Sequence, residues 1–477
     1  MNILFVSPEV VPFAKTGGLA DVIGALPEAI AKRDHISNLI LPFYRTVKTN
    51  GFRPILFKAN IPVELGTKKD QFNLYFLRHN SCNVYFVEKD DLYDRDFLYG
   101  TPKGDYPDNA LRFGFFAKAV IESIHYIGKQ DIIHCNDWQS ALIPLYLKVF
   151  YKDQDNFKAT KVLFTIHNMA YQGLFEKGVL ETLGLSEEFF TPEKLEFYGK
   201  VNFMKAGIIY SDAISTVSEG YAREILTPEF GCGLDGLLRT RKNVVYGIVN
   251  GVDYSVWNPA VDTFIKANYD EKDLSNKKIC KKDLVEQFGI QYDPDRPLIG
   301  MITRLAEQKG IDLVNDAMPQ MVKMGMDFVL LGFGDEKYND IFRKLAKKYS
   351  GHVAARIDFD NALAHKIEAG CDMFLMPSRY EPCGLNQLYS LKYATVPIVR
   401  AVGGLDDTIE NFNPLTKKGN GFKFKEATSE ALLRTLKEAC NIFKNKPLWE
   451  ILLHNCVSCD YSWASSAEKY ERLYNRL

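Results

Sequence analysis

The chain has 477 residues, which is too long for a single hydrophobic core, so we expect two or three domains. Its 59 Lys and Arg nearly balance its 60 Asp and Glu, so no overall field would attract nucleic acid or an anionic membrane. Hydrophobic residues make up 46% and charged residues 25%, a composition typical of soluble globular proteins, which excludes a disordered chain. The N-terminus has no signal-peptide pattern and no apolar run could span a bilayer, so we predict a cytoplasmic protein.

The nine cysteines are odd in number and scattered from Cys82 to Cys459, which favours reduced thiols over a disulfide framework. Cys456 and Cys459 form one Cys-x-x-Cys pair, but no second pair or His cluster accompanies it. The pair therefore does not predict a zinc or redox site.

The first predicted element is an apolar strand at residues 3–6, of the kind buried in a parallel sheet. A loop with Lys15, Gly17 and Gly18 follows, and apolar residues at helical spacing from 19 to 30 predict a helix directly after it. Backbone N–H groups at a helix N-terminus can face an anion where glycine leaves room, and Lys15 adds positive charge. We therefore predict a phosphate-binding loop, with a tight turn before a surface helix as the simpler alternative.

Short apolar strands alternate with helical stretches along the whole chain, a pattern typical of βαβ units and parallel sheets. A polar, lysine-rich stretch at residues 270–282 separates two such series. We therefore predict an α/β protein with two doubly wound domains of similar size, joined near Asn250 and Gly251. The expected strands lie at residues 3–6, 132–134, 162–165, 213–217, 244–249, 298–303, 328–331, 353–357, 373–376 and 396–399.

Cations follow the first strand of each series, where ligands bind in open α/β sheets, so we expect a central cleft between the domains. Arg304 and Lys309 follow the first strand of the second series, and together they could hold one diphosphate. Cations fixed there would stabilise a departing nucleoside diphosphate during glycosyl transfer. The alternative is two solvated charges in an exposed loop.

Residues 377–385 also follow a predicted strand and combine a proline, a glycine and a following helix. Such a segment can present backbone N–H groups to a phosphate or a sugar. Glu381 could accept hydrogen bonds from a hexose or offset developing positive charge. The pair Gly403 and Gly404 repeats this arrangement after the next strand.

Polar residues end two strands of the first series. Asp137 follows His134, and Asn168 follows His167, so these side chains would converge on the cleft. Asp, His and Asn can fix a sugar ring by hydrogen bonds, although a lone His at a strand end is often a structural residue. Neither His has a partner at metal-ligand spacing.

The sequence gives little support for a metal or a dinucleotide. Asp-x-Asp, which holds a divalent metal in one class of sugar-nucleotide enzymes, occurs at residues 153–155, 293–295 and 358–360. Only the third follows a strand, so it is the only plausible metal site. Gly332 and Gly334 lack the third glycine of a dinucleotide fingerprint, because residue 337 is Lys.

Residues 465–468 read Ser-Ser-Ala-Glu, a capping-box pattern that predicts a final helix. Ala467, Tyr470, Tyr474 and Leu477 share one face of that helix. The helix should therefore dock on another element.

Taken together, these segments resemble bacterial glycogen synthases and plant starch synthases, the retaining glucosyltransferases that use ADP-glucose and have two Rossmann-like domains (the GT-B fold). The resemblance runs nearly end to end. Its motifs are KTGGLADV at 15–22, YPDNALRF at 106–113, HCNDW at 134–138, FTIHNMAYQG at 164–173, STVSEGYAREI at 215–225, GIVNGVDYSVWNP at 247–259, TRLAEQKG at 303–310, PSRYEPCGLNQLYSLKY at 377–393 and DYSW at 460–463.

The resemblance implies glucose transfer from ADP-glucose to the non-reducing end of an α-1,4-glucan, with retention of configuration and without a cofactor or metal. It also implies a first domain at residues 1–250, a second at 251–459, and a C-terminal helix at 460–477 that returns to the first domain. The implied partners are ADP-glucose and a glucan such as glycogen or a maltooligosaccharide, with no nucleic acid and no membrane. The oligomeric state stays open.

The resemblance also implies roles for particular residues. The catalytic set would be Asp137 and His167 at the glucose, Arg304 and Lys309 on the diphosphate, and Glu381 on the glucose and the distal phosphate. The substrate-binding set would be Lys15, Gly17, Gly18, Asp21, Asn168, Asn250, Phe359, Cys383, Gly384, Leu385 and Asn386.

The chain departs from the family pattern at several positions. Asp358-Phe359 stands where a Gly-aromatic pair is usual near the adenine, so Phe359 could stack on a base while the added carboxylate affects nucleotide preference. Residues 34–36 also differ from the usual Gly-His-Asp-Val, which we interpret as a surface change. Further departures are Asn386 in place of Thr, and Ser390 and Ala394 in place of Gly.

Two alternatives remain at this point. The chain could be a related transferase that uses UDP-glucose or another donor, such as a sucrose-synthase-like one, or a non-catalytic glucan-binding protein that has kept the fold. The presence of Lys15, His167, Arg304, Lys309 and Glu381 argues against the second alternative.

Overall fold

The structure is a computed structural model that describes residues 1–477, and it divides into two compact units. The first unit comprises Met1–Val217, Ala222–Gly251 and Trp463–Leu477. The second comprises Ser218–Tyr221 and Val252–Ser462. The sequence did not predict that the short segment Ser218–Tyr221 belongs to the second unit.

A nine-stranded sheet forms the centre of the first unit. Its strands are β1 (Asn2–Val6), β2 (Ile36–Pro42), β3 (Ile55–Leu65), β4 (Lys68–His79), β5 (Cys82–Glu88), β8 (Ile132–Asn136), β9 (Lys161–Ile166), β13 (Ala213–Thr216) and β14 (Val245–Gly247). Their spatial order is β14-β13-β9-β8-β1-β2-β5-β4-β3, parallel from β14 to β5 and antiparallel from β5 to β3. The strand order reverses at β1, which pairs with β2 on one side and β8 on the other.

Helices cover both faces of this sheet, and the apolar residues 3–6 of β1 are fully buried as a result. The helices are α1 (Gly18–Ala31), α2 (Arg45–Thr49), α3 (Asp90–Tyr93), α4 (Asn109–Ile127), α5 (Leu142–Tyr146), α6 (Val179–Leu183), α7 (Phe203–Tyr210), α8 (Glu219–Glu224), which starts in the Ser218–Tyr221 segment, α9 (Asp235–Thr240) and α18 (Trp463–Tyr474). Single helical turns are η1 (Trp138–Ser140), η2 (Leu147–Tyr151), η3 (Glu187–Phe189) and η4 (Lys242–Val244). The remaining short strands are β6 (Gly100–Thr101), β7 (Gly104–Asp105), β10 (Leu174–Glu176), β11 (Glu196–Phe197) and β12 (Lys200–Asn202).

The second unit is built on a six-stranded parallel sheet. Its strands are β15 (Leu298–Leu305), β16 (Asp327–Gly334), β17 (Val353–Arg356), β18 (Met373–Met376), β19 (Val396–Arg400) and β20 (Phe422–Phe424). The spatial order β17-β16-β15-β18-β19-β20 is the 3-2-1-4-5-6 order of a Rossmann fold. Ligands bind in such sheets beyond the strand ends where the order reverses, which here is between β15 and β18.

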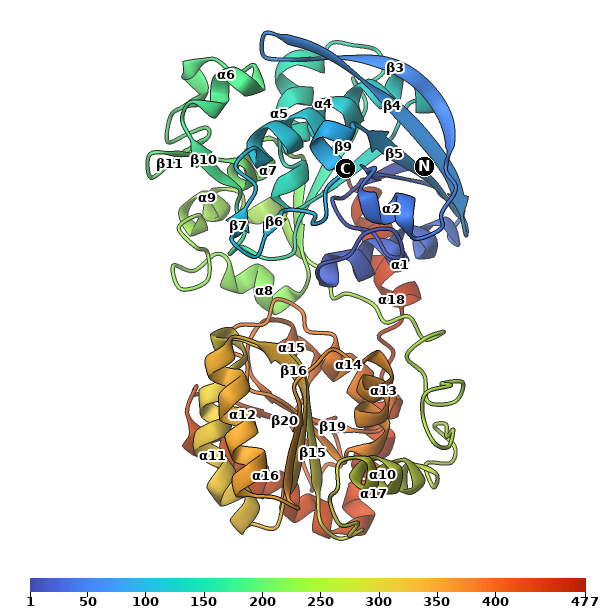
Figure 1. Ribbon diagram of the computed structural model, residues 1–477, viewed down its shortest axis with the longest axis vertical. Coiled ribbons are helices and arrows are strands. Elements are labelled where there is room, and N and C mark those ends of the chain that lie inside the picture. The colour runs from blue at the N-terminus through green and yellow to red at the C-terminus, as the bar shows by residue number, and fades with distance from the viewer. The chain divides into compact units, whose positions relative to one another are not determined.

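Helices lie on both faces of this second sheet, with α11 and α12 on one face and α10 and α13 on the other (Figure 1). They are α10 (Lys277–Gln287), α11 (Ile311–Lys323), α12 (Glu336–Lys348), α13 (Asn361–Gly370), α14 (Asn386–Lys392), α15 (Gly403–Thr408), α16 (Ser429–Lys444) and α17 (Lys446–Val457), with the single turn η5 (Glu307–Lys309). The predicted α/β class with two doubly wound domains is confirmed.

The C-terminal helix α18 packs against α1 in the first unit, as predicted (Figure 1). It starts at Trp463, earlier than the capping-box pattern indicated, and the Ser466 hydroxyl donates to the carbonyl of Val249 at 2.7 Å. Ser466 therefore ties the helix to the chain after β14.

Arg33 and His35, which precede β2, contact α18, so within residues 34–36 the interpretation as a surface change holds for Asp34 and Ile36 but not for His35. Glu471 of α18 accepts hydrogen bonds from Arg33 and lies 2.9 Å from the His35 ring nitrogen. The His35 side chain is only 10% exposed, whereas Asp34 and Ile36 are exposed. The ion pairs hold the pKa of Glu471 below its usual range, mainly through the Arg33 guanidinium.

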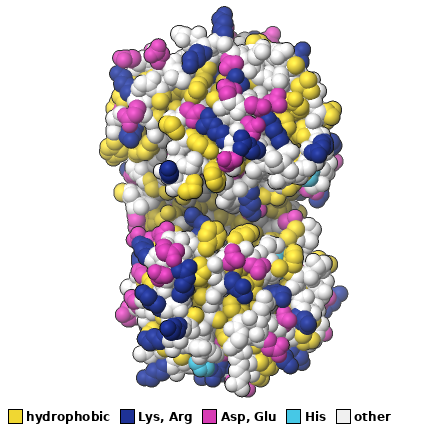
Figure 2. Space-filling model, in the orientation of Figure 1, with side chains coloured by type: hydrophobic (Ala, Val, Ile, Leu, Met, Phe, Trp, Pro, Cys, Tyr) yellow, Lys and Arg dark blue, Asp and Glu magenta, His cyan; other side chains and the backbone are white.

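Basic and acidic side chains are interspersed over the face drawn in Figure 2. None of the helices has the length and apolar character that crossing a membrane would need.

Candidate active site

The loop after β1 is organised by Glu9, a buried residue that is 4% exposed. One of its carboxylate oxygens accepts the backbone N–H groups of Thr16 at 2.5 Å and Gly17 at 3.0 Å. The other accepts the hydroxyl of Thr16 at 2.6 Å. The N–H of Gly17 is therefore already bonded, and an anion at this loop would meet the N–H groups from Gly18 onward, where α1 has no side-chain cap.

Lys15 lies beside this loop and forms an ion pair with Asp21 of α1, at 2.7 Å. Both side chains are exposed, by 51% and 37% respectively. A Cβ atom on Gly17 or Gly18 would meet nothing within 4 Å, so the loop has open space in front of it. The loop thus offers a solvated cation and a helix N-terminus side by side.

Asp137 follows β8 with φ 55° and ψ 178°, a backbone conformation that residues other than glycine rarely adopt. One carboxylate oxygen accepts the backbone N–H of His167 at 2.8 Å, which links the ends of β8 and β9. Burial raises the pKa of Asp137 to about 7 despite that hydrogen bond. Strain and a perturbed pKa at a strand end are features of functional residues.

His167 follows β9 and is oriented by Asn136, the last residue of β8. The Asn136 amide donates to the carbonyls of Val6 and His134, so its oxygen accepts from His167 Nε2 at 2.9 Å. Nε2 therefore carries the proton. Burial lowers the pKa of His167 to about 3, so the ring is neutral at pH 7 and acts as a polar group without charge.

His134 does not join this group, because its side chain points toward the C-terminal helix. The ring is fully buried and contacts the Tyr474 hydroxyl at 2.8 Å and the Thr165 hydroxyl at 2.6 Å. Burial lowers the pKa of His134 to about 3. His134 is therefore a structural residue and not one that could bind a sugar.

Two further predicted site residues of the first unit, Asn168 and Asn250, carry side-chain amides. The Asn168 side chain accepts the backbone N–H of Ala170 at 3.0 Å, which shapes the loop after His167. Asn250 is 5% exposed, and its buried Oδ1 has no hydrogen-bond partner within the protein. A buried acceptor without a partner is costly unless a ligand or water satisfies it.

In the second unit, Lys309 and Glu381 form a largely buried ion pair of 2.6 Å, with side chains 17% and 10% exposed. Lys309 follows β15 and Glu381 follows β18, so the pair lies where the strand order reverses. The Ser378 hydroxyl donates to the same Glu381 oxygen at 2.9 Å. Arg304, the penultimate residue of β15, is exposed.

Glycines allow the segments after β15 and β18 to approach each other closely. Gly310 has φ 66°, and a Cβ atom there would lie 2.3 Å from the carbonyl oxygen of Pro377. Gly384 has φ 71°, and Cys383 next to it is 6% exposed. Leu385 precedes α14, and Asn386 donates to the carbonyl of Ile302 in β15 at 2.8 Å.

Phe359 and the third Asp-x-Asp motif lie between β17 and α13. The Phe359 side chain is 76% exposed, so its ring is accessible. Asp358 accepts the N–H of Phe359 at 2.7 Å, and Asp360 caps α13 by accepting the N–H of Leu363 at 2.9 Å. Asp360 therefore has a structural role, and no group of three or more His, Cys, Asp or Glu side chains is arranged to hold a metal ion.

Sequence reasoning missed the residues that support the predicted ones. Glu9, Asn136 and Ser378 are all buried next to a predicted site residue. Ser218 donates to the carbonyl of Pro382 at 2.6 Å and so supports the segment that holds Glu381. The sequence indicated these residues only indirectly, because they lie within or next to motifs in which other residues were predicted to have a role.

The comparisons with known proteins cover the whole chain. Residues 2–240 match the family model of the starch synthase catalytic domain, and residues 285–445 match that of glycosyl transferases group 1. Glycogen synthase of Koribacter versatilis (strain Ellin345) is 48% identical, covering 100% of this chain and 98% of that protein. Glycogen synthase of Geotalea daltonii is 46% identical, covering 99% and 98%.

A solved structure agrees with these sequence matches. The catalytic domain of starch synthase IV from Arabidopsis thaliana, bound to ADP and acarbose, superimposes with a TM-score of 0.89 at 32% identity. The match covers 99% of this chain and 98% of that domain. The chain therefore belongs to the glycogen and starch synthase family of glycosyltransferases, with the GT-B fold.

Proposed function

We propose that the protein transfers glucose from ADP-glucose to the 4-hydroxyl at the non-reducing end of an α-1,4-glucan, with retention at the anomeric carbon. Glycogen synthases are among its relatives, and the solved starch synthase carries ADP. The observation that carries the proposal is the Lys309–Glu381 ion pair, which lies at the sheet position where ligands bind. Arg304 lies near the end of β15, which leads into the segment that carries Lys309.

The reaction breaks the bond between the anomeric carbon and a phosphate oxygen, and ADP departs with the electron pair. Lys309 and Arg304 stabilise the negative charge that develops on this leaving group, in the manner of an oxyanion hole. Because these cations are supplied by side chains, we propose that no divalent metal and no cofactor is needed. The new bond forms to the acceptor oxygen, whose proton passes to the departing phosphate.

The first unit supplies polar groups for the oxocarbenium-like transition state. We propose that Asp137, His167, Asn168 and Asn250 bind the glucose, and that neutral His167 contributes a hydrogen bond rather than a charge. The unpartnered Oδ1 of Asn250 is then satisfied by a sugar hydroxyl. Lys15, with the start of the helix at Gly17 and Gly18 and with Asp21 close by, binds donor phosphate.

The second unit holds the rest of the donor. Glu381 accepts hydrogen bonds from the glucose, while Cys383, Gly384, Leu385 and Asn386 provide backbone contacts to the sugar and the distal phosphate. The ring of Phe359 is 76% exposed, so it is accessible and stacks on the adenine.

Labelled ADP-glucose and UDP-glucose offered separately with glycogen test this proposal. We expect label in the glucan from ADP-glucose at a rate at least about tenfold higher than from UDP-glucose. Preference for UDP-glucose would point to the related transferase and would draw attention to Asp358 beside Phe359. Glucan binding without transfer from either donor would indicate the non-catalytic alternative.

A further inference from the structure

Glu9 is a buried carboxylate whose four hydrogen bonds all serve one loop and one tyrosine. One oxygen accepts the N–H groups of Thr16 and Gly17, and the other accepts the hydroxyls of Thr16 and Tyr99, the latter at 2.7 Å. Two carboxylate oxygens offer about four acceptor positions, so this arrangement uses all of them. Within the loop, only Thr16 and Gly17 donate to the Glu9 carboxylate.

We propose that Glu9 is a positioning residue for the donor phosphate, acting through the loop that carries Lys15. By taking the N–H groups of Thr16 and Gly17, Glu9 fixes the direction in which α1 starts, and it leaves the later N–H groups for an anion. This inference rests on the proposed function, in which the loop contacts the donor phosphate. A displacement of about 1 Å at such a loop can cost a hundredfold in rate.

The motif YPDNALRF at 106–113, for which we predicted no role from the sequence, supports Glu9 indirectly through Tyr99. The carbonyl of Tyr99 accepts the Asn109 amide at 2.8 Å, and the oxygen of that amide accepts Arg112 Nη1 at 2.7 Å. Arg112 is fully buried and also donates to the carbonyl of Leu92 at 2.7 Å. A hydrogen-bonded chain therefore runs from Arg112 in α4 through Asn109, Tyr99 and Glu9 to the loop.

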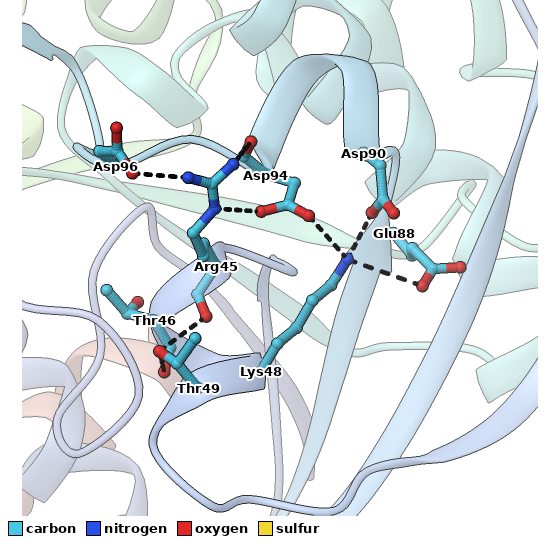
Figure 3. A network of polar contacts seen from close by, with 8 residues as sticks. All are labelled: Arg45, Thr46, Lys48, Thr49, Glu88, Asp90, Asp94 and Asp96. Atoms are coloured by element: carbon cyan, nitrogen blue, oxygen red, sulfur yellow. Dashed lines mark hydrogen bonds and ion pairs between the residues drawn. The ribbon is translucent and has the colours of Figure 1, made fainter.

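Ion pairs fix the segment that carries Tyr99. Arg45 of α2 donates to Asp94 at 2.6 Å and to Asp96 at 2.5 Å, and Lys48 lies 2.5 Å from Asp90 (Figure 3). Further along, Arg95 pairs with Asp108, the residue before α4. Tyr99 is thus held by contacts on both sides of it in the sequence.

The direction in which Glu9→Gln changes ADP affinity distinguishes a positioning role of Glu9 from a purely electrostatic one. A negative carboxylate near a phosphate site repels the phosphate, so removing only the charge would tighten ADP binding. Glu9→Gln is nearly isosteric, but its amide NH2 group opposes two of the four donors, so the loop loses its fixed geometry. The proposal therefore requires that Glu9→Gln weaken ADP binding.

Calorimetric titration with ADP, together with KM for ADP-glucose and for glycogen, tests the proposal on the full chain. We expect Glu9→Gln to weaken ADP binding about tenfold or more and Tyr99→Phe about threefold, with KM for glycogen changed by less than about twofold. The matched control is Tyr146→Phe, which removes a buried phenol hydroxyl bonded to the carbonyl of Leu183 at 2.9 Å in the same unit. Tyr146→Phe should lower the melting temperature comparably but leave ADP binding unchanged.

Unchanged or tighter ADP binding by Glu9→Gln would overturn the inference while leaving the proposed function in place. Absence of ADP binding by the unmodified protein would overturn both. If Glu9→Gln does not fold, Thr16→Val removes a single bond to Glu9, and ADP affinity equal to that of the unmodified protein would then be the contradicting result.

Discussion

The two units hold the lysines for which we propose phosphate binding in opposite ways. Lys15 in the first unit pairs with Asp21 at the surface, with side chains 51% and 37% exposed. Lys309 in the second unit pairs with Glu381 in a largely buried position, with 17% and 10% exposed. Exposed pairs contribute about 0–1 kcal/mol to stability, whereas removing one partner of a buried pair costs about 3–5 kcal/mol. Lys309 is therefore preorganised by its own pair, while Lys15 depends on the backbone loop that carries it.

The largest effect is expected for a substitution of Lys309. We expect Lys309→Ala to lower turnover by about two to four powers of ten, because a preorganised cation is lost from the leaving group. Stability should also fall by a few kcal/mol, roughly, since Glu381 keeps a buried charge without a partner. Steady-state kinetics beside a denaturation curve measure both effects.

The matched control for this variant is Lys281→Ala in the same unit. Lys281 forms a buried ion pair of 2.8 Å with Asp372, which precedes β18 and so lies at the opposite end of that strand from Glu381. It should lose similar stability but keep its turnover below the melting temperature. Equal turnover losses in the two variants would mean that Lys309 acts on stability alone.

Lys15 should show the reverse pattern. Lys15→Ala should raise KM for ADP-glucose about tenfold and leave the melting temperature within about 1 °C, because only a solvated ion pair is lost. Lys32→Ala, at the other end of α1 and paired with Glu28 at 2.9 Å, is the control and should change neither quantity. A large drop in melting temperature for Lys15→Ala would contradict the contrast between the units.

Asp137 extends the comparison of the two units, because it is a buried carboxylate in the first unit. Its pKa rises from 3.8 to about 7 on folding, so between these values the folded state binds more protons and stability falls as pH rises. Above pH 7 the full cost of the buried charge is present. Asp137→Asn removes this cost, and we expect it to be more stable than the unmodified protein by about 1–3 kcal/mol at pH 8.

The same difference should shrink as the pH falls and vanish toward about pH 3, where Asp137 is mostly protonated in both states. The lowered pKa of His167 makes acid destabilising as well, but it affects both proteins and cancels in the comparison. Denaturant titrations at pH 4, 6 and 8 measure the trend. A constant difference across these pH values would rule out the titration of Asp137 as its cause.

The smallest effect is expected for metal removal. If side-chain cations in both units carry the leaving group, exhaustive chelation should change turnover by less than about twofold. An assay in EDTA, with magnesium and manganese added back, decides this. Loss of activity that either metal restored would contradict the assignment to Lys15, Arg304 and Lys309.

Much of the fold could be predicted because its central strands are apolar and parallel. The predicted strand at 373–376 coincides with β18, and most of the others differ from the observed ones by a few residues at their ends. Strands β2, β5 and β20 were missed. The hairpin of β3 and β4 was also missed, because β3 contains register shifts and exposed residues from 55 to 58 that break the alternation of a strand. The start of α18 was misplaced, because the helix begins at Trp463, before the Ser465 that the capping-box pattern marks as its cap.

The sequence located Asp137, His167 and Arg304 at strand ends, and the first two directly follow β8 and β9 while Arg304 is the penultimate residue of β15; their roles stay predictions. The supporting residues could not be located in this way, because a lone Glu or Asn has no periodicity or spacing that distinguishes it. Glu9 becomes recognisable only when Tyr99, distant in sequence, is seen to bind it. Asp360 shows the converse, since its motif suggested a metal but its carboxylate caps a helix.

The docking of α18 on the first unit has a consequence for how the protein is made. A ribosome synthesises the chain from its N-terminus, so β1 and α1 emerge early, whereas Tyr474, which binds His134 of β8, emerges 340 residues after His134. The second unit, Ser218–Tyr221 and Val252–Ser462, is complete before Trp463–Leu477 is released. At about 5–20 residues per second, the nascent first unit waits tens of seconds for its last helix with part of its core uncovered. The unit that begins synthesis is thus the last to finish folding.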